Sequence, residues 1–375
     1  MDWTLTIGLV VSAAAALTMA LAVTVIKVVH GEVMRWRGVR TAHYIAAVGE
    51  MVSRRLLPAS PPRSWAHDTY FHDVLSDYRL LLTGADREFI DRLATETGVH
   101  AVLVARCDAR WLQARRLRAL SSLVDLADER HVGDLRRYLG DSNRHVRINA
   151  VRGLARLGDK VSIEPILDLA AQSRSWEAAR MADALAEMGS VAVEPICHWI
   201  AAAVARDEAP GVVALAARIL GLIGDPEAEA TLISLLESDR PDWRLAASSA
   251  LEHTGGDAAV APLLTALDDP AWSVRARAAV ALGALADSSV GPSLALLLTD
   301  RVWWVRQNAA EALVGLPGGT DILLDTLDSP DRFAVDAALN QLTLSGLLGE
   351  ASERVAHGSA TARDQRLVEK AAGRV

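Results

Sequence analysis

The sequence predicts an all-α protein, an α-solenoid of short helical repeats preceded by one transmembrane helix. Of its 375 residues, 51% are hydrophobic and 23% are charged, with only three phenylalanines and four tyrosines. This composition favours packed helices over strands or disorder. An uncharged apolar run lies near the N-terminus, and a pattern of about 30 residues recurs from residue 111 onward.

These observations divide the chain into four expected parts. Residues 1–30 form a transmembrane anchor, 31–108 a juxtamembrane helical segment with an N-terminal cap, 109–345 the repeat solenoid, and 346–375 a C-terminal helix or tail. The cap is expected because the first repeat of a solenoid would otherwise expose its apolar end.

The anchor is predicted from residues 5–26, which carry no charge. At about 1.5 Å per residue, such a helix can cross a hydrocarbon core of roughly 30 Å. A cleaved signal peptide is the alternative, since residues 20–22 read Ala-Leu-Ala. Against it, the run is long and no positive charge precedes it. The membrane contact is expected to extend over residues 5–29.

Flanking charges predict the orientation of the anchor. Lys27, Arg35, Arg37 and Arg40 follow the apolar run, whereas only Asp2 precedes it. Because positive residues favour the cytoplasmic side, we expect a single-pass protein of the inner or plasma membrane with its N-terminus outside and its large C-terminal domain in the cytoplasm.

Small residues recur at four-residue spacing within the anchor. They are Gly8, Ser12, Ala16 and Ala20. Such a stripe lets a second membrane helix approach closely, although an alanine-rich span also produces the pattern by chance.

The repeat is clearest in three copies, which begin at Asp141, Asp269 and Asp300. Weaker copies begin near Ser175, Pro210 and Pro241, and the pattern fades between 331 and 342. Each copy opens with a helix-capping residue, continues with Val-Arg or a related pair, and then places apolar residues three and four positions apart. Each copy therefore predicts one longer helix followed by a shorter one.

Junction residues predict where these helices end and begin. The dipeptides Gly158-Asp159, Gly224-Asp225 and Gly256-Asp257 suit a left-handed glycine cap followed by an aspartate N-cap. We expect proline in the first turn of the shorter helices, at Pro165, Pro195, Pro262 and Pro292.

These features resemble HEAT-like repeats of the short class found in relatives of the phycobilisome lyases. The resemblance covers residues 111–342. It implies an α-solenoid, and it implies that arginines following the valine form a ladder between repeats through aspartate or backbone carbonyl oxygens. The arginines at these positions are Arg147, Arg244, Arg275 and Arg306.

Tryptophans cluster where the longer helices begin and are the candidate partner-binding residues: Trp176, Trp243, Trp272, Trp303 and Trp304. A tryptophan there could pack against the preceding repeat or form an exposed aromatic ridge, and we favour packing because of the large area it buries. Trp303 and Trp304 are the exception, since adjacent helix positions point about 100° apart. One of them is the best single candidate for a partner contact.

The segment before the repeats is expected to contain helices at 31–57, 68–82 and 85–96, with a proline-rich break at 58–62. His67-Asp68 and His72-Asp73 invite a metal site. Their five-residue spacing does not hold both histidines on one helix face, so we expect a structural cap instead.

No phosphate-binding loop, zinc-protease motif or nucleophile elbow occurs in the sequence. Deoxyhypusine hydroxylase is similar in fold, but its recurrent His-Glu pairs are missing here. Cys107 and Cys197 form no paired motif, and the net charge of −8 disfavours nucleic-acid binding. We expect no cofactor, no metal and no catalysis.

The leading functional hypothesis is therefore a membrane-anchored scaffold that binds protein partners, including membrane proteins. An anchor, a helical cap and tryptophan-marked repeats resemble bacterial envelope components that accompany membrane glycosyltransferases. Two alternatives stay open. One is a lyase-like or metal- or cofactor-binding enzyme on the concave face, and the other is a solenoid secreted after cleavage of residues 1–22.

Overall fold

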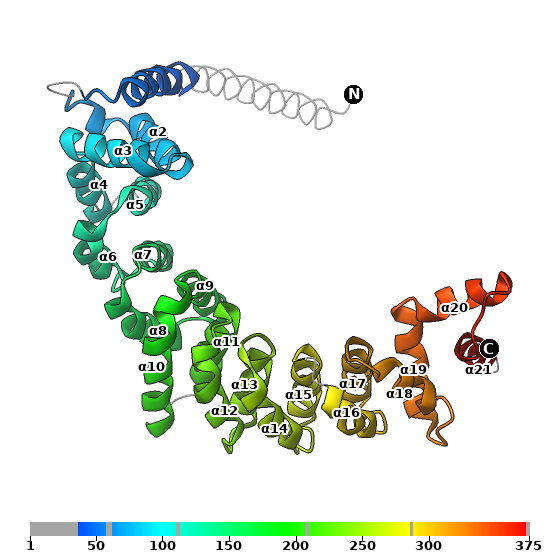
Figure 1. Cartoon of the computed structure of the whole chain (residues 1–375). Coiled ribbons are helices and arrows are strands. Elements are labelled where there is room, and N and C mark those ends of the chain that lie inside the picture. The colour runs from blue at the N-terminus through cyan, green and yellow to red at the C-terminus, as the bar shows by residue number, and fades with distance from the viewer. Residues whose placement is uncertain (1–36, 58–61, 110–112, 207–209, 286–287, 373–375) are drawn as a thin grey trace, which may run out of the picture. The chain divides into compact units, whose positions relative to one another are not determined.

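The computed structural model describes residues 37–57, 62–109, 113–206, 210–285 and 288–372 (Figure 1). The predicted anchor, its small-residue stripe Gly8, Ser12, Ala16 and Ala20, and most of the proline-rich break lie outside these residues. Within them, no single helix has both the length and the apolar character needed to cross a membrane. The segments Ser175–Ala186 and Gly189–Ala205 are long and apolar enough only when they are taken together, and a bend of 117° separates them.

Helices form every regular element of the described chain, as the sequence predicts, and they group into two compact units, 1–134 and 135–375. The first unit contains a helix over residues 37–54. It is followed by α2 (Thr69–Leu81), α3 (Gly84–Thr97), α4 (Val99–Asp108) and α5 (Gln113–Leu126).

The core of the first unit is apolar and is tied together by one buried arginine. Phe71, Phe89 and Leu103 are almost completely buried. Arg79 of α2 pairs with Asp91 of α3 at 2.6 Å and donates to main-chain carbonyl oxygens at the end of α5. The arginine stem can fill apolar space while its head satisfies buried acceptors, so it fixes α2 against α3 and α5.

The second unit is a stack of helix pairs in two layers. The longer helices are α7 (Arg144–Arg156), α9 (Ser175–Ala186), α11 (Pro210–Ile223), α13 (Pro241–Thr254), α15 (Trp272–Ala284), α17 (Trp303–Gly315) and α19 (Arg332–Leu344). Each contacts the next in the series. The order of these helices follows directly from the repeat pattern of the sequence.

The shorter helices form the other layer. They are α8 (Ile163–Ala171), α10 (Val193–Ala205), α12 (Glu229–Leu236), α14 (Asp257–Ala266), α16 (Gly291–Leu297) and α18 (Gly319–Thr326). The short helix α6 (Val132–Tyr138) precedes them. Alanine and leucine at three- and four-residue spacing are buried between the layers, which matches the periodicity of the sequence.

Two helices close the C-terminal end, α20 (Leu347–Ala356) and α21 (Ala362–Ala372). Arg366 and Lys370 of α21 pair with Asp328, just after α18, and Arg363 pairs with Asp321 of α18 at 3.0 Å. The C-terminal helix α21 is therefore held against the last repeat by these ion pairs.

One predicted junction is wrong. Gly158 and Gly224 are left-handed, with φ of 67° and 70°, as expected for helix caps. Gly256 instead has a φ of −121°, and Asp257 is the first residue of α14 rather than its cap. Two consecutive glycines, Gly255 and Gly256, end α13 in extended form, and the amide of Gly256 donates to Glu229 at 2.6 Å.

One predicted proline position is also wrong. Pro165, Pro195 and Pro292 lie in the first turn of α8, α10 and α16, each after a short 3₁₀ turn. Pro262 lies inside α14, at its sixth residue. The reason is that α14 has no separate 3₁₀ turn before it and begins several residues earlier relative to its proline.

Candidate functional site

An aspartate begins each of the three clearest repeats and shapes the turn into the longer helix. The Oδ1 atoms of Asp141, Asp269 and Asp300 accept hydrogen bonds from the amides two residues later, at 2.8, 2.8 and 2.7 Å. A short polar side chain that bonds the backbone two residues on stabilises a turn. The same carboxylates remain able to accept from a neighbouring repeat.

Arginines of the preceding repeat use that remaining capacity. Arg244 of α13 donates from Nε and Nη2 to Asp269 at 2.6 and 2.9 Å. Arg275 of α15 makes the same two-bond contact with Asp300 at 2.8 and 3.0 Å. All four side chains are at least 87% buried. Two parallel charge-assisted bonds fix both distance and orientation, so each pair sets the register of two stacked repeats.

The third guanidinium nitrogen of Arg275 and of Arg306 bonds to the main chain of the aspartate that begins the same repeat. Nη1 of Arg275 donates to the carbonyl oxygen of Asp269 at 2.8 Å, and Nη1 of Arg306 donates to that of Asp300 at 2.7 Å. The resulting chain of contacts, called here the arginine ladder, runs through Arg244, Asp269, Arg275, Asp300 and Arg306.

Two of the four predicted ladder arginines, Arg147 and Arg306, depart from the pairing with an aspartate. Arg147 pairs with Glu177 of α9 at 3.0 Å instead of with an aspartate. Arg306 lacks a carboxylate partner among the described residues and lies over the ring of Phe333, with 5.0 Å from its guanidinium carbon to the ring centroid. A guanidinium stacks well on an aromatic face, so Phe333 takes the place of the carboxylate.

Burial and hydrogen bonding have opposite effects on the ladder carboxylates. Burial alone would raise the pKa of Asp300, but the bonds from Arg275 and the Val302 amide outweigh it and leave the pKa below its ordinary value. The pKa of Asp269 is lowered in the same way by Arg244 and the Ala271 amide, against burial. Both groups are therefore ionised at neutral pH.

The predicted tryptophans separate into one buried and four exposed side chains. Trp243 is only 3% exposed, because it lies in the first turn of α13 on its inward face, so it is removed from the candidate contact residues. Trp176, Trp272, Trp303 and Trp304 are 41, 47, 49 and 57% exposed. The burial of Trp243 fits a packing role. Trp176 is covered only in part, by the guanidinium carbon of Arg144, which lies 5.3 Å from the centroid of its ring.

Phe333 joins the exposed tryptophans although the sequence did not single it out. It is 48% exposed and is the second residue of α19, just as Trp272 and Trp303 are the first residues of α15 and α17. Its distance along the chain from Trp303, one repeat length, is the signal that could have identified it. We call Trp272, Trp303, Trp304 and Phe333 the aromatic edge.

Trp303 and Trp304 form the most exposed part of the aromatic edge. Their ring centroids are 4.6 Å apart, and the rings meet edge to face at 79°. This arrangement is favourable for two aromatic rings and holds both in defined orientations. Both rings remain open to solvent at the start of α17, where no earlier helical turn covers them.

Metal-binding geometry does not occur in the part of the chain that the structure describes, where no three histidine, cysteine or acidic side chains gather. His72 is instead a buried residue of α2 whose Nε2 donates to the carbonyl oxygen of Ala66 at 2.6 Å. Cys107 is buried and Cys197 is half-buried, and neither forms a disulfide.

Comparison with known families gives matches to a model described as HEAT repeats, over residues 101–190, 198–273 and 260–343. None of the curated proteins matches the chain significantly.

Several solved structures are similar to the chain. The complex of CpcE and CpcF of phycocyanin lyase from Nostoc matches at 25% identity over 41% of this chain and 99% of the other, with a TM-score of 0.38. The karyopherin Kap121p matches at 15% identity over 84% of this chain and 42% of its own, with a TM-score of 0.47. Human deoxyhypusine hydroxylase matches at 20% identity over 82% and 97%, with a TM-score of 0.28.

Proposed function

The chain belongs to the family of HEAT-repeat proteins, and from that premise we propose that it is a non-catalytic scaffold whose aromatic edge binds a protein partner. The observation that carries this proposal is the exposure of Trp272, Trp303, Trp304 and Phe333 at the starts of three successive longer helices, α15, α17 and α19. Solenoids of this kind present extended surfaces to protein partners. Aromatic residues are enriched in the energetic centres of protein interfaces.

The arginine ladder supports the proposal because it fixes the spacing of the aromatic edge. Arg275 ties the start of α17 to α15, and Arg306 stacks on Phe333 at the start of α19. Side chains held in place before binding lose little conformational entropy when a partner arrives. The ladder is thus a structural device, and the aromatic edge is the contact surface.

Crosslinking of the full-length protein in intact cells tests the contact surface. The double variant Trp303→Ala/Trp304→Ala should lose most of the partner that wild type captures, since truncating such residues commonly weakens binding by about tenfold or more. Leu296→Ala is the matched control, because Leu296 is 75% exposed on α16 and lies off the aromatic edge. Equal capture by wild type and the double variant would refute docking at the aromatic edge.

We retain the membrane anchor, its orientation and an association with an envelope glycosyltransferase system as part of the proposal. The anchor and its orientation rest on the apolar run 5–26 and the positive charges that follow it. The glycosyltransferase association rests only on the resemblance to bacterial envelope components. In inside-out membrane vesicles, protease should digest the solenoid, whereas in intact spheroplasts it should not. The opposite pattern, or recovery of chains lacking residues 1–22 outside the cell, would contradict the orientation.

An enzymatic role is the alternative, and elemental and absorption analysis of the purified full chain distinguishes it. A pure scaffold should carry neither a stoichiometric metal nor a chromophore. Finding either one bound in a one-to-one ratio would reject the scaffold proposal in its non-catalytic form.

A further inference from the structure

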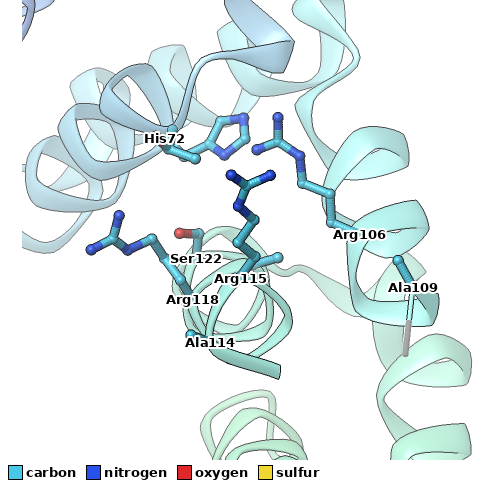
Figure 2. A pocket seen from close by; sticks show the side chains of 9 residues that line it. His72, Arg106, Ala109, Ala114, Arg115, Arg118 and Ser122 are labelled. Atoms are coloured by element: carbon cyan, nitrogen blue, oxygen red, sulfur yellow. The ribbon is translucent and has the colours of Figure 1, made fainter. Parts of the chain in front are cut away.

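A pocket of about 590 Å³ opens between α2, α4 and α5 in the first unit, far along the chain from the aromatic edge (Figure 2). Its polar lining consists of Thr69, His72, Arg106, Arg115, Arg118 and Ser122. Alanines contribute the remaining walls. The volume falls within the range of pockets that bind small organic molecules.

The charge of this pocket has one sign. Three arginines line it, and no lining residue is a carboxylate. Figure 2 shows the guanidinium groups of Arg106, from α4, and Arg115, from α5, turned toward each other beside the His72 ring. Two guanidinium cations at close range repel each other. An anion bound between them would attract both and offset that repulsion.

The sequence of α5 produces this arrangement. Arg115, Arg118 and Ser122 follow each other at three- and four-residue spacing and therefore share one face of the helix. Neither Arg115 nor Arg118 makes a hydrogen bond or ion pair with another residue in the described part of the chain. Arg106 differs, because its Nη2 donates to the carbonyl oxygen of His67 at 2.6 Å and holds the side chain in position.

Asp73 does not line the pocket, but it interacts electrostatically with Arg118 and offsets part of that arginine's charge. Burial raises the pKa of Asp73, while Arg118 and Arg37 act against that rise. Burial lowers the pKa of His72 to about 4, and Arg106 adds to the effect. His72 is thus a neutral wall at physiological pH, fixed by its bond to Ala66.

Ser122 adds a neutral donor. Its side chain is 6% exposed, and it lines the pocket together with Arg115 and Arg118. Figure 2 shows the hydroxyl between Arg115 and Arg118 on the pocket side of α5. A hydroxyl can donate one hydrogen bond, so Ser122 can add a neutral donor for a ligand oxygen beside the arginines.

We propose that this pocket binds a phosphate monoester, with the phosphate held by Arg106, Arg115 and Ser122 and the organic part against the alanine walls. Arginine forks match phosphate oxygens in pairs, and three oxygens of a dianion can engage several donors at once. The ligand is either a soluble organic phosphate or the monoester headgroup of an anionic lipid. This site lies in a different unit from the aromatic edge and does not depend on the proposed function.

Calorimetry on the full chain in phosphatidylcholine nanodiscs tests the pocket, with glycerol 3-phosphate as the probe. Wild type should bind it, and binding should weaken as salt is raised. Arg115→Gln should weaken binding by about tenfold, because a charge-assisted contact is lost. Arg87→Gln is the control. Arg87 is exposed on α3 and lies outside the pocket, so this substitution removes the same charge from the same unit without touching the pocket lining.

Two further arms identify the source and the chemistry of the ligand. If phosphatidic acid in the nanodisc blocks glycerol 3-phosphate, the occupant is a lipid headgroup, and if it does not, the occupant is a soluble monoester; both outcomes support the pocket. The proposal is overturned if wild type does not bind the probe, if Arg115→Gln behaves like Arg87→Gln, or if succinate binds more tightly than the phosphate.

Discussion

Single residues of the arginine ladder serve two purposes at once. Asp300 shapes the turn into α17 through its bond to the Val302 amide and also accepts two bonds from Arg275. A local turn and a contact between repeats therefore depend on the same carboxylate. Losing the arginine leaves that buried carboxylate with only part of its hydrogen bonding, which is far more costly than losing an exposed ion pair.

Arg275→Ala should therefore lower the free energy of unfolding by about 3–5 kcal/mol. Arg306→Ala should cost only about 1–2 kcal/mol, since Arg306 contributes one carbonyl bond and a ring contact. Urea unfolding followed by circular dichroism gives both values. Arg277→Ala is the control on the same helix: its partner Glu252 lies 3.3 Å away and its side chain is 41% exposed, so less than about 1 kcal/mol is expected.

The spacing of whole helices depends on small residues where neighbours cross. A side-chain carbon built on Gly283 of α15 would lie 2.9 Å from the Cα atom of Ala312 on α17. Gly221 of α11 meets Ala250 of α13 in the same way, at 2.7 Å. Neither contact can be relieved by rotating a side chain, so glycine permits these helix pairs to approach closely.

Gly283→Ala should accordingly destabilise the solenoid, although alanine is the better helix former by about 1 kcal/mol. Overpacking of this kind costs roughly 1–3 kcal/mol and should exceed that gain. Gly349→Ala on α20 is the control, because nothing lies within 4 Å of its added carbon, and it should leave stability unchanged or raise it. Thermal unfolding of both variants decides the point, and a stabilised Gly283→Ala would contradict the close contact.

At the scale of the whole molecule, stability is a sum of contacts between neighbouring repeats. The pKa values of Asp269 and Asp300 lie below the unfolded value, which is about 3.9. A carboxyl group whose pKa is lower in the folded than in the unfolded protein stabilises the fold fully at pH values above the unfolded pKa. That stabilisation is lost as the pH falls through the lower, folded pKa. Acid should therefore weaken the interfaces of α13, α15 and α17 together.

Hydrogen exchange at about pH 5 and about pH 3, corrected for intrinsic rates, tests this expectation. Amides of α15 and α17 should lose more protection in wild type than in Asp300→Asn, which keeps an oxygen for the Val302 amide but has no charge to titrate. Equal losses in the two proteins would show that the ladder carboxylate does not govern the acid response.

The sequence by itself determined the helices and their repeat length, and the resemblance to HEAT-like repeats indicated the ladder arginines. These features are local, because helix caps and apolar spacing act within one repeat and recur with it. Even so, Gly256 and Pro262 departed from their expected positions, since the double glycine at 255–256 removed the usual turn before α14. Local patterns specified which elements exist more reliably than where each one begins.

Only the tertiary structure decided which of those residues face solvent and which meet a partner. Trp243 and Trp272 both lie in the first turn of a longer helix, as the third residue of α13 and the first of α15, yet one is buried and the other is 47% exposed. Arg147 found a glutamate and Arg306 an aromatic ring. The phosphate pocket likewise brings together Thr69 and Ser122 from helices that the sequence treats separately. The exposure of a side chain and the partner that it contacts depend on residues that are far away along the chain. No local sequence pattern specifies which of those residues come close in space.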